Sequence, residues 1–147
     1  MNVAFETLLR DIATTLGIDA AELVRTQEIT VDDHTIGLHC EGEGEATQCI
    51  FFTTVAPLYD AQFTRLARTL LEANYLWAGT NDCTLAIQPV TGNLALCVQV
   101  AVAALDGGRA AAVLDTFVDT AQFWRAVVED AGESLLLQSS PVRVMTV

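Results

Sequence analysis

The chain contains no lysine: its seven basic residues are all arginine, nineteen acidic residues oppose them, and the formal net charge is −12. Without lysine the protein can neither form a Schiff base nor hold a nucleotide phosphate as P-loop proteins do. The negative charge also repels phosphate backbones and anionic lipid surfaces. We therefore expect no nucleic-acid binding and no membrane binding, whereas a basic polypeptide would be attracted.

Apolar runs long enough to cross a bilayer, which takes roughly 20 residues, are missing as well. The longest candidate, Leu94 to Leu105, contains Gln99. The start, Met1 to Leu9, lacks the positive region and the apolar stretch of a signal peptide. We therefore expect a cytoplasmic protein, in which cysteines stay reduced as free thiols. These cysteines are Cys40, Cys49, Cys83 and Cys97.

The sequence shows no recognisable catalytic or metal-binding pattern. His34, His39, Cys40 and Cys49 lie close together, but the paired Cys-x-x-Cys units of closed zinc sites are absent. We interpret the cysteines as small buried side chains and the histidines as residues at hairpin edges. A glycine-rich phosphate loop is absent too. We expect no metal, no cofactor and no enzymatic activity.

Hydrophobic residues, by contrast, make up 52% of the chain and charged residues 18%, the composition of a folded globular domain. Apolar residues at helical spacing predict three main helices, and alternating or continuous apolar stretches predict five strands. In chain order we expect a helix over 5–16 with a short turn at 20–24, strands at 29–31, 36–40 and 49–55, a helix over 61–74, strands at 84–88 and 94–100, and a final helix with an apolar stripe from Ala110 to Val128.

Short hairpins join most of the strands, so neighbours in the chain should pair in the sheet. The predicted fold is α+β, in the order α-β-β-β-α-β-β-α, with an antiparallel twisted sheet and helices packed against it. Residues 1–130 are expected to form a single domain. Residues 131–147 stay unassigned, because Pro141 interrupts any regular element there.

Three details of this pattern bear on function. The second main helix, which Asp60 is expected to cap, has an apolar arc wider than one buried stripe requires, so we predict contacts on two sides. The strand at 94–100 is apolar at nearly every position, which is typical of a central strand covered on both faces. Arg125 is expected to face water from the final helix.

Several segments together carry a family resemblance. They are Leu8-Leu9 with Gly17-Ile18, Leu70-Leu71-Glu72-Ala73-Asn74-Tyr75-Leu76-Trp77, Thr84-Leu85-Ala86-Ile87, Gly92-Asn93-Leu94-Ala95-Leu96 and Phe123-Trp124-Arg125. With these segments the chain, from about Phe5 to Asp130, resembles the class I chaperones of bacterial type III secretion, the Tir-chaperone family. The loop at Gly79 departs from the pattern, because it has one glycine where many relatives carry two.

The resemblance implies a cytoplasmic bacterial homodimer with a role in virulence. Such a chaperone binds the N-terminal segment of a type III secreted effector, keeps the segment non-globular, and promotes its export by delivering it to the secretion ATPase. An alternative stays open, namely a regulatory adaptor on the same fold that sequesters a regulator of the secretion system.

Binding without catalysis needs surface, and an extended peptide can add to a sheet edge while its side chains enter grooves beside helices. Our candidates for contact with the effector come from the first helix and the first three strands, although some of them could simply form the core: Phe5, Leu8, Ile12, Ile29, Ile36, Leu38, Ile50 and Phe52. Our candidates for the dimer interface come from the second main helix and the hairpin that follows: Leu70, Ala73, Tyr75, Trp77 and Leu85.

Overall fold

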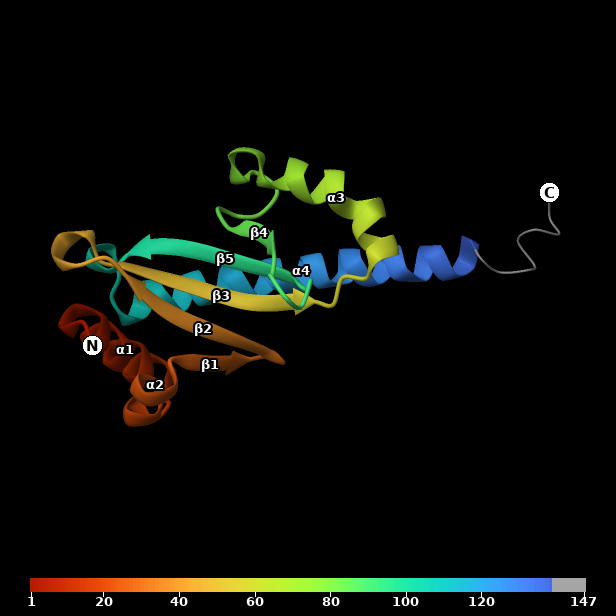
Figure 1. Cartoon of the computed structure of the whole chain (residues 1–147). Coiled ribbons are helices and arrows are strands. Elements are labelled where there is room, and N and C mark those ends of the chain that lie inside the picture. Colours follow the sequence, from red (N-terminus) through yellow and green to blue (C-terminus); the bar gives the residue numbers. More distant parts are fainter. Residues whose placement is uncertain (139–147) are drawn as a thin grey trace.

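The computed structural model describes residues 1–138 as one α+β unit with the predicted order of elements (Figure 1). Its elements are α1 (Val3–Leu16), α2 (Ala20–Thr26), β1 (Glu28–Val31), β2 (His34–Glu41), η1 (Gly44–Ala46), β3 (Gln48–Ala56), α3 (Asp60–Asn74), η2 (Tyr75–Trp77), β4 (Thr84–Ile87), β5 (Leu94–Ala101), η3 (Val102–Ala104) and α4 (Gly107–Gln138). The predicted α+β class and the antiparallel sheet are confirmed.

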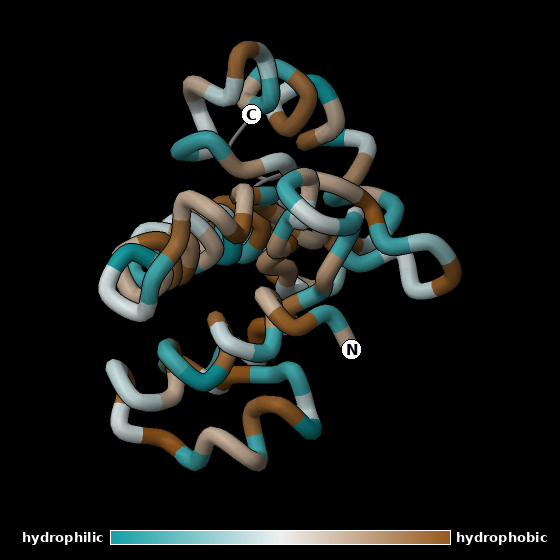
Figure 2. The backbone as a smooth tube through the Cα atoms, turned by 90° about the vertical axis from the view of Figure 1, so that its left-hand side faces the viewer, coloured by the Kyte–Doolittle hydropathy of each residue, from teal (hydrophilic) through white to brown (hydrophobic). Residues whose placement is uncertain are grey.

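The five strands form one antiparallel sheet in the order β1-β2-β3-β5-β4, so β3 is the central strand. The long helix α4 runs behind the strands in Figure 1, with α1 and α2 below them and α3 above. Viewed from the side, Figure 2 again separates α3 at the top from α1 and α2 at the bottom. Helix α4 therefore covers one face of the sheet, α1 and α2 lie on the side of the edge strand β1, and α3 lies on the side of the edge strand β4. Within residues 1–138 no α-helix covers the opposite face.

The core lies between α1, α4 and the covered face of the sheet. At its centre the rings of Phe51 from β3 and Phe117 from α4 are 6.5 Å apart, and both side chains are buried. The predicted stripe of α4 is confirmed: its buried members are Ala110, Leu114, Phe117, Ala121, Trp124 and Val128. Alternate residues of β2, β3 and β5 complete this core, as a sheet with one covered face requires.

Short polar caps define where the helices begin. The side chain of Asp19 accepts a hydrogen bond of 3.1 Å from the Glu22 amide at the start of α2. In α3, however, the cap residue is Tyr59, and Asp60 lies inside the first turn. The Gln62 side chain accepts a hydrogen bond of 3.0 Å from the Tyr59 amide. The prediction that Asp60 caps this helix is therefore wrong. The cap lies one residue earlier, at Tyr59, and the Gln62 side chain binds the amide of that residue.

One further expectation, that of a central strand covered on both faces, needs correction. Strand β5 lies next to the edge of the sheet rather than at its centre, and only Leu94 and Leu96 of this strand are fully buried. Its continuous apolar pattern reflects half-buried residues on both faces. The unassigned stretch after Asp130 begins as helix, because α4 continues to Gln138. Pro141 and the rest of residues 139–147 lie outside the described residues.

Truncation of Phe117 tests this account of the core. Phe117→Ala should lower the free energy of unfolding by about 3–5 kcal/mol, because it leaves a cavity beside Phe51. Val3→Ala, at an exposed position of α1, should change it by less than about 0.5 kcal/mol. Urea unfolding at one fixed protein concentration measures both; a similar small effect of the two substitutions would contradict the placement of Phe117 at the centre of the core.

Candidate protein-binding surfaces

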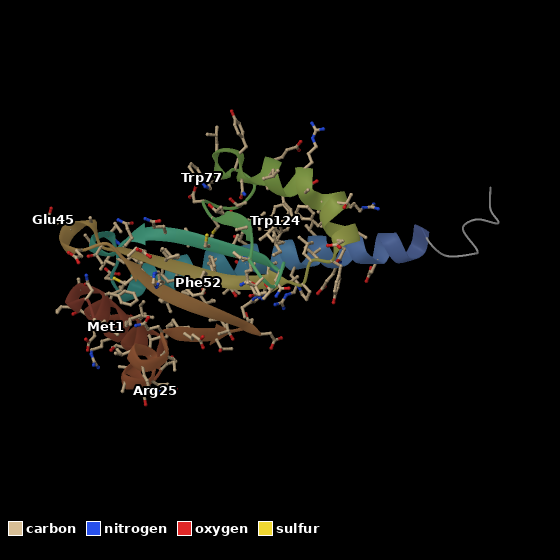
Figure 3. All side chains as sticks on the ribbon, viewed as in Figure 1. Met1, Arg25, Glu45, Phe52, Trp77 and Trp124 are labelled. Carbon is tan, nitrogen blue, oxygen red and sulfur yellow. The ribbon has the colours of Figure 1, made fainter. Side chains whose placement is uncertain are left out.

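The uncovered face of the sheet has an apolar centre. Register places Phe52 of β3 between Gly37 of β2 and Cys97 of β5, and Thr84 of β4 pairs with Cys97 on the other side. The next row along the strands contains His39, Ile50 and Gln99. Phe52 is 45% exposed, and Figure 3 shows it near the middle of the strands. We call this surface, centred on Ile50, Phe52 and Cys97, the open sheet face.

Gly37 fixes the position of the Phe52 ring. A Cβ atom at Gly37 would lie 2.3 Å from Phe52 Cζ, so the ring covers the glycine backbone. At the other end of the same row, Trp77 Nε1 donates a hydrogen bond of 3.3 Å to Thr84 Oγ1. The two aromatic side chains are thus held in place at separate points of the row, and both keep about half of their surface exposed.

A second apolar surface is formed by α3, the turn after it and β4. Leu71 is 72% exposed and Tyr75 is 74% exposed. Together with these two residues, the exposed apolar side chains of this region are Phe63, Leu76, Trp77 and Ile87, and we call this set the α3 surface. The opposite side of the helix packs inward through Leu66 and Leu70. The wide apolar arc that the sequence predicts therefore has one buried side and one exposed side.

Between α3 and β4 lies a hollow of about 240 Å³, lined mostly by apolar side chains that include Phe63, Leu71 and Ile87. Asn74 also lines this hollow. Its side-chain amide donates a hydrogen bond of 2.9 Å to the Leu85 carbonyl, and its side-chain oxygen accepts one of 2.9 Å from the Leu85 amide. The outer edge of β4 is therefore satisfied by a side chain at this point, and α3 is fixed to the sheet.

A polar contact inside the molecule joins α4 to the strands. Arg125 Nε donates a hydrogen bond of 3.0 Å to the Val55 carbonyl, and Arg125 Nη2 lies 3.3 Å from His34 Nδ1. His34 is only 1% exposed, and its Nε2 atom has no partner. His34 stands at the edge of the β1–β2 hairpin as expected, paired with Val31, but its side chain is buried. The expectation that Arg125 faces water is wrong, because its guanidinium group bonds inside the subunit. Burial and the charge of Arg125 lower the pKa of His34, against the opposing effect of Asp33 and Asp32.

Most of the residues proposed for effector contact lie in the subunit core. These are Phe5, Leu8, Ile12, Ile29, Ile36 and Leu38. Their side chains are covered by the subunit itself, which is the alternative that the sequence left open. Ile50 and Phe52 differ, because they belong to the open sheet face. Successive side chains of a strand point to opposite faces of the sheet, so a strand covered on one face buries every second side chain. The sequence alone did not show which of the two faces is covered.

The residues proposed for the dimer interface divide in the same way. Tyr75 and Trp77 are exposed, whereas Leu70 and Leu85 are buried within the subunit. Ala73 is half-buried, and its Cα would lie 3.0 Å from a Cβ added at Gly79, so the turn after α3 packs against it. Sequence reasoning missed the exposed Leu71, Leu76 and Ile87, although Leu71 lies on the same wide arc.

The cysteines and histidines show no arrangement typical of catalysis. Burial, together with neighbouring groups, raises the pKa of Cys49 to about 12 and that of Cys83 to about 11. Both thiols are therefore protonated near neutral pH and are poor nucleophiles. Among the described residues no group of three or more His, Cys, Asp or Glu side chains could hold a metal ion. None of the described helices is long and apolar enough to span a membrane.

Fold and surfaces together define a class of protein: a small α+β subunit that exposes apolar surfaces on one face of its sheet and along α3. Residues 7–125 match the Tir chaperone protein (CesT) family. The chain belongs to this family, and the resemblance seen in the sequence is confirmed. No protein with a curated description matches the sequence.

Solved structures share the fold at low identity. A chain of the HopA1–SchA chaperone–effector complex has a TM-score of 0.69 and 15% identity, over 85% of this chain and 95% of that one. A chain of the ExsC–ExsE complex has a TM-score of 0.65 and 20% identity, over 87% and 97%. A chain of the complex between the Yersinia pestis type III secretion chaperone SycH and a fragment of YscM2 has a TM-score of 0.62 and 22% identity, over 80% and 96%.

The buried His34 predicts a specific dependence of stability on pH. Its pKa in the folded protein is lowered, so below about pH 6.5, the usual histidine value, the unfolded chain binds more protons than the folded one. Stability should therefore be constant above that pH and fall as the pH drops toward the lowered pKa, by at most about 1.4 kcal/mol per pH unit.

Urea unfolding at pH 7.5 and pH 5.5 tests this prediction. His34→Gln, which keeps an acceptor for Arg125, should remove most of the decrease. The matched control is His39→Gln, because His39 is exposed and bonds only to Glu41; this variant should keep the decrease of the unaltered protein. An equal decrease in the His34 variant would show that other groups cause it.

Proposed function

We propose that this protein is a cytoplasmic export chaperone that binds the N-terminal segment of a type III secreted effector and keeps it non-globular. The observation that carries the proposal is the open sheet face, where Phe52 lies exposed beside the half-buried Ile50 on a strand whose other side is packed. Membership of the Tir chaperone family and the fold shared with a chain of a chaperone–effector complex support it. The protein acts by binding and catalyses no reaction.

The energetics of this activity require apolar surface. Ordering a disordered segment costs about 2–5 kcal/mol, and burial of about 200 Å² of apolar area contributes about 5 kcal/mol. Phe52, about half exposed, supplies part of that area on the chaperone side. The net charge of −12 favours segments with basic residues and opposes binding of acidic ones.

The α3 surface is our candidate for the contact between two copies of the chain. Its exposed apolar residues belong to α3, to the turn after it and to β4. The helix is fixed at both ends, by Asn74 at the sheet and by a hydrogen bond of 3.1 Å from Gln62 to the Val128 carbonyl. A rigid apolar surface suits a permanent contact, because little ordering is required when it is covered. Pairing of two copies would leave both open sheet faces for one effector segment, which the dimer would then deliver to the secretion ATPase.

Phe52→Asp tests the binding role of the open sheet face. The N-terminal segments of the type III substrates of the same bacterium are co-expressed one by one with the chaperone, and co-elution in size exclusion identifies a bound segment. Phe52→Asp should then weaken binding at least about tenfold, because a charge is buried against apolar groups. Gln122→Asp, at an exposed position of α4, adds the same charge away from this face.

The result expected for Gln122→Asp is unchanged affinity. Equal affinity of the Phe52 variant would contradict the role of this face. Co-elution with an intracellular regulator of the system, and with none of the substrates, would instead favour the regulatory adaptor.

Leu71→Asp tests the role of the α3 surface. The substitution should convert dimers into monomers in multi-angle light scattering, since it places a charge in the centre of the proposed contact. Leu71 is exposed in the subunit, so the fold should persist, with an unchanged circular dichroism spectrum. Val3→Asp, at an exposed site of α1, is the control and should leave the mass unchanged. A Leu71→Asp protein that remains dimeric would place the contact elsewhere.

A further inference from the structure

Two of the four cysteines lie directly opposite each other in the sheet. The register of β2 and β3 pairs Cys40 with Cys49, and cross-strand partners direct their side chains to the same face. Cys49 alternates with exposed or half-buried neighbours along β3 and shares its side with the buried Phe51, so both thiols belong to the covered face. Cys49 is buried, whereas Cys40 is half-buried. The pair thus lies at the end of the hairpin that the loop 42–47 closes, with one thiol partly accessible.

Backbone hydrogen bonds show what kind of pair this is. The Leu38 amide donates a hydrogen bond of 2.9 Å to the carbonyl that precedes β1, so Leu38 directs its backbone groups toward β1. The Thr47 carbonyl accepts one of 3.0 Å from the amide that follows β5, so Thr47 directs its groups toward β5. These directions repeat at every second residue of a strand. Cys40 and Cys49 therefore turn their backbone groups away from each other and form a non-hydrogen-bonded pair.

This geometry fits a disulfide bond. In a non-hydrogen-bonded antiparallel pair the Cα atoms are about 4.5 Å apart, and disulfides join Cα atoms that are about 4.4–6.8 Å apart. The bond can therefore form by rotation of the two side chains, with little movement of the backbone. The electrostatics agree with this proximity, because burial first and Cys40 second raise the pKa of Cys49 to about 12.

The other two cysteines differ in this respect. Thr84, and not Cys83, is the partner of Cys97 on β5. Cys83 lines a hollow beside α4 together with Phe117, whereas Cys97 lines a hollow on the open sheet face. Their side chains thus point to opposite faces, and cysteines whose Cβ atoms point apart cannot be bridged without backbone movement. The chain therefore contains its own matched control for the pair on β2 and β3.

The pair closes the base of a compact loop. Gly42 has a φ of 80°, and a Cβ atom there would lie 2.5 Å from the Ala46 carbonyl oxygen. The Thr47 hydroxyl donates a hydrogen bond of 2.7 Å to the Gly44 carbonyl. On its outer side the loop forms one wall of a hollow of about 440 Å³, and residues of α1 that include Leu8 form another. A covalent link at the base would hold this wall in place.

We propose that Cys40 and Cys49 form a reversible cross-strand disulfide in the presence of a small disulfide such as oxidised glutathione, and that the bond locks the end of the β2–β3 hairpin. While the surrounding thiols are reduced, both cysteines stay free, as is usual inside cells. The open sheet face lies on the other side of the strands, so Phe52 keeps its place in both states. The bond changes the rigidity of the hairpin and leaves the surface proposed for binding as it is.

The reaction consists of two thiol–disulfide exchanges. The thiolate of Cys40, the accessible partner, attacks one sulfur of the small disulfide, forms a mixed disulfide and releases one thiolate. The thiolate of Cys49 then attacks Cys40 Sγ, forms the protein disulfide and releases the second thiolate. The protein loses two electrons and two protons, which the two released thiols carry away. Since Cys49 is protonated near neutral pH, the second exchange should be the slower one, and the mixed disulfide should be visible first.

Mass spectrometry of a tryptic digest of the complete chain tests the proposal. Because the chain has no lysine, trypsin cuts only after arginine, so the fragment 26–65 contains Cys40 and Cys49 and the fragment 69–109 contains the other two cysteines. The protein is incubated with oxidised glutathione, and its remaining thiols are alkylated. Fragment 26–65 should then carry no alkyl group and be about 2 Da lighter than its reduced form. Fragment 69–109 should contain no internal disulfide.

Serine variants identify the partners. Cys97→Ser is the matched control and should form the bond at the rate of the unaltered protein. Cys40→Ser should leave Cys49 reduced and open to alkylation once the protein is denatured; loss of that thiol in this variant would assign its oxidation to another partner. In the unaltered protein, a fragment 26–65 that remains alkylated at both cysteines, or that stops at the mixed disulfide, would overturn the proposal. A bond between two copies of the chain would overturn it as well.

The lock itself is tested by the stability of the two states. The oxidised protein should unfold at a temperature at least about 3 °C higher than the reduced one, because the bond restricts the unfolded chain. Amides of the loop 42–47 should exchange at least about threefold more slowly, while amides of α3 should be unchanged. Excess reduced glutathione should reverse both effects. An unchanged unfolding temperature and loop exchange would show that the bond does not lock the hairpin, and a bond that this thiol cannot reduce would contradict its reversibility.

Discussion

One-sided packing of the sheet determines the rest of this structure. α1 and α4 pack against a single face of the strands (Figure 1), and the apolar residues of that face, with Phe51 and Phe117 at the centre, complete a core within one subunit. Since successive side chains alternate between the faces, the same strands must present a second set of residues to the outside. Stability and binding surface are therefore divided between the two faces of the same strands, and Phe52 can remain exposed without weakening the core around Phe51.

Exposed apolar groups in this protein are attached to fixed elements. Gln62 joins the start of α3 to α4, and Asn74 joins its end to β4. The ring of Phe52 lies over Gly37, where any larger residue would displace it. A surface held in this way loses little conformational entropy on binding, so more of the free energy of apolar burial is available to order a disordered partner. The described part of the chain thus combines a rigid frame with surfaces that its own core does not need.

The element order and the apolar stripe of α4 could be predicted from the sequence, because both depend on local periodicity. The surfaces could be predicted only in part. The wide arc of α3 indicates a second contact, yet whether Leu70 or Leu71 faces outward depends on how the helix is rotated about its axis. The contact between Arg125 and His34 joins residues 91 positions apart, and no local pattern encodes it. The pairing of Cys40 with Cys49 depends on the register of β2 against β3, which propensities do not fix to within a residue or two.

The arginines explain how an acidic protein can expose apolar surface and still distinguish between partners. Arg10, Arg25 and Arg68 each pair with a glutamate of their own helix, and Arg109 and Arg125 donate to the backbone carbonyls of Ala104 and Val55. Most arginines of residues 1–138 are thus bonded within the subunit, whereas most of the nineteen acidic residues have no arginine partner among these residues. The resulting negative field opposes uncontrolled association of identical apolar surfaces and attracts basic segments. In the proposed function, apolar contact supplies most of the affinity, and charge selects the unfolded segments that approach.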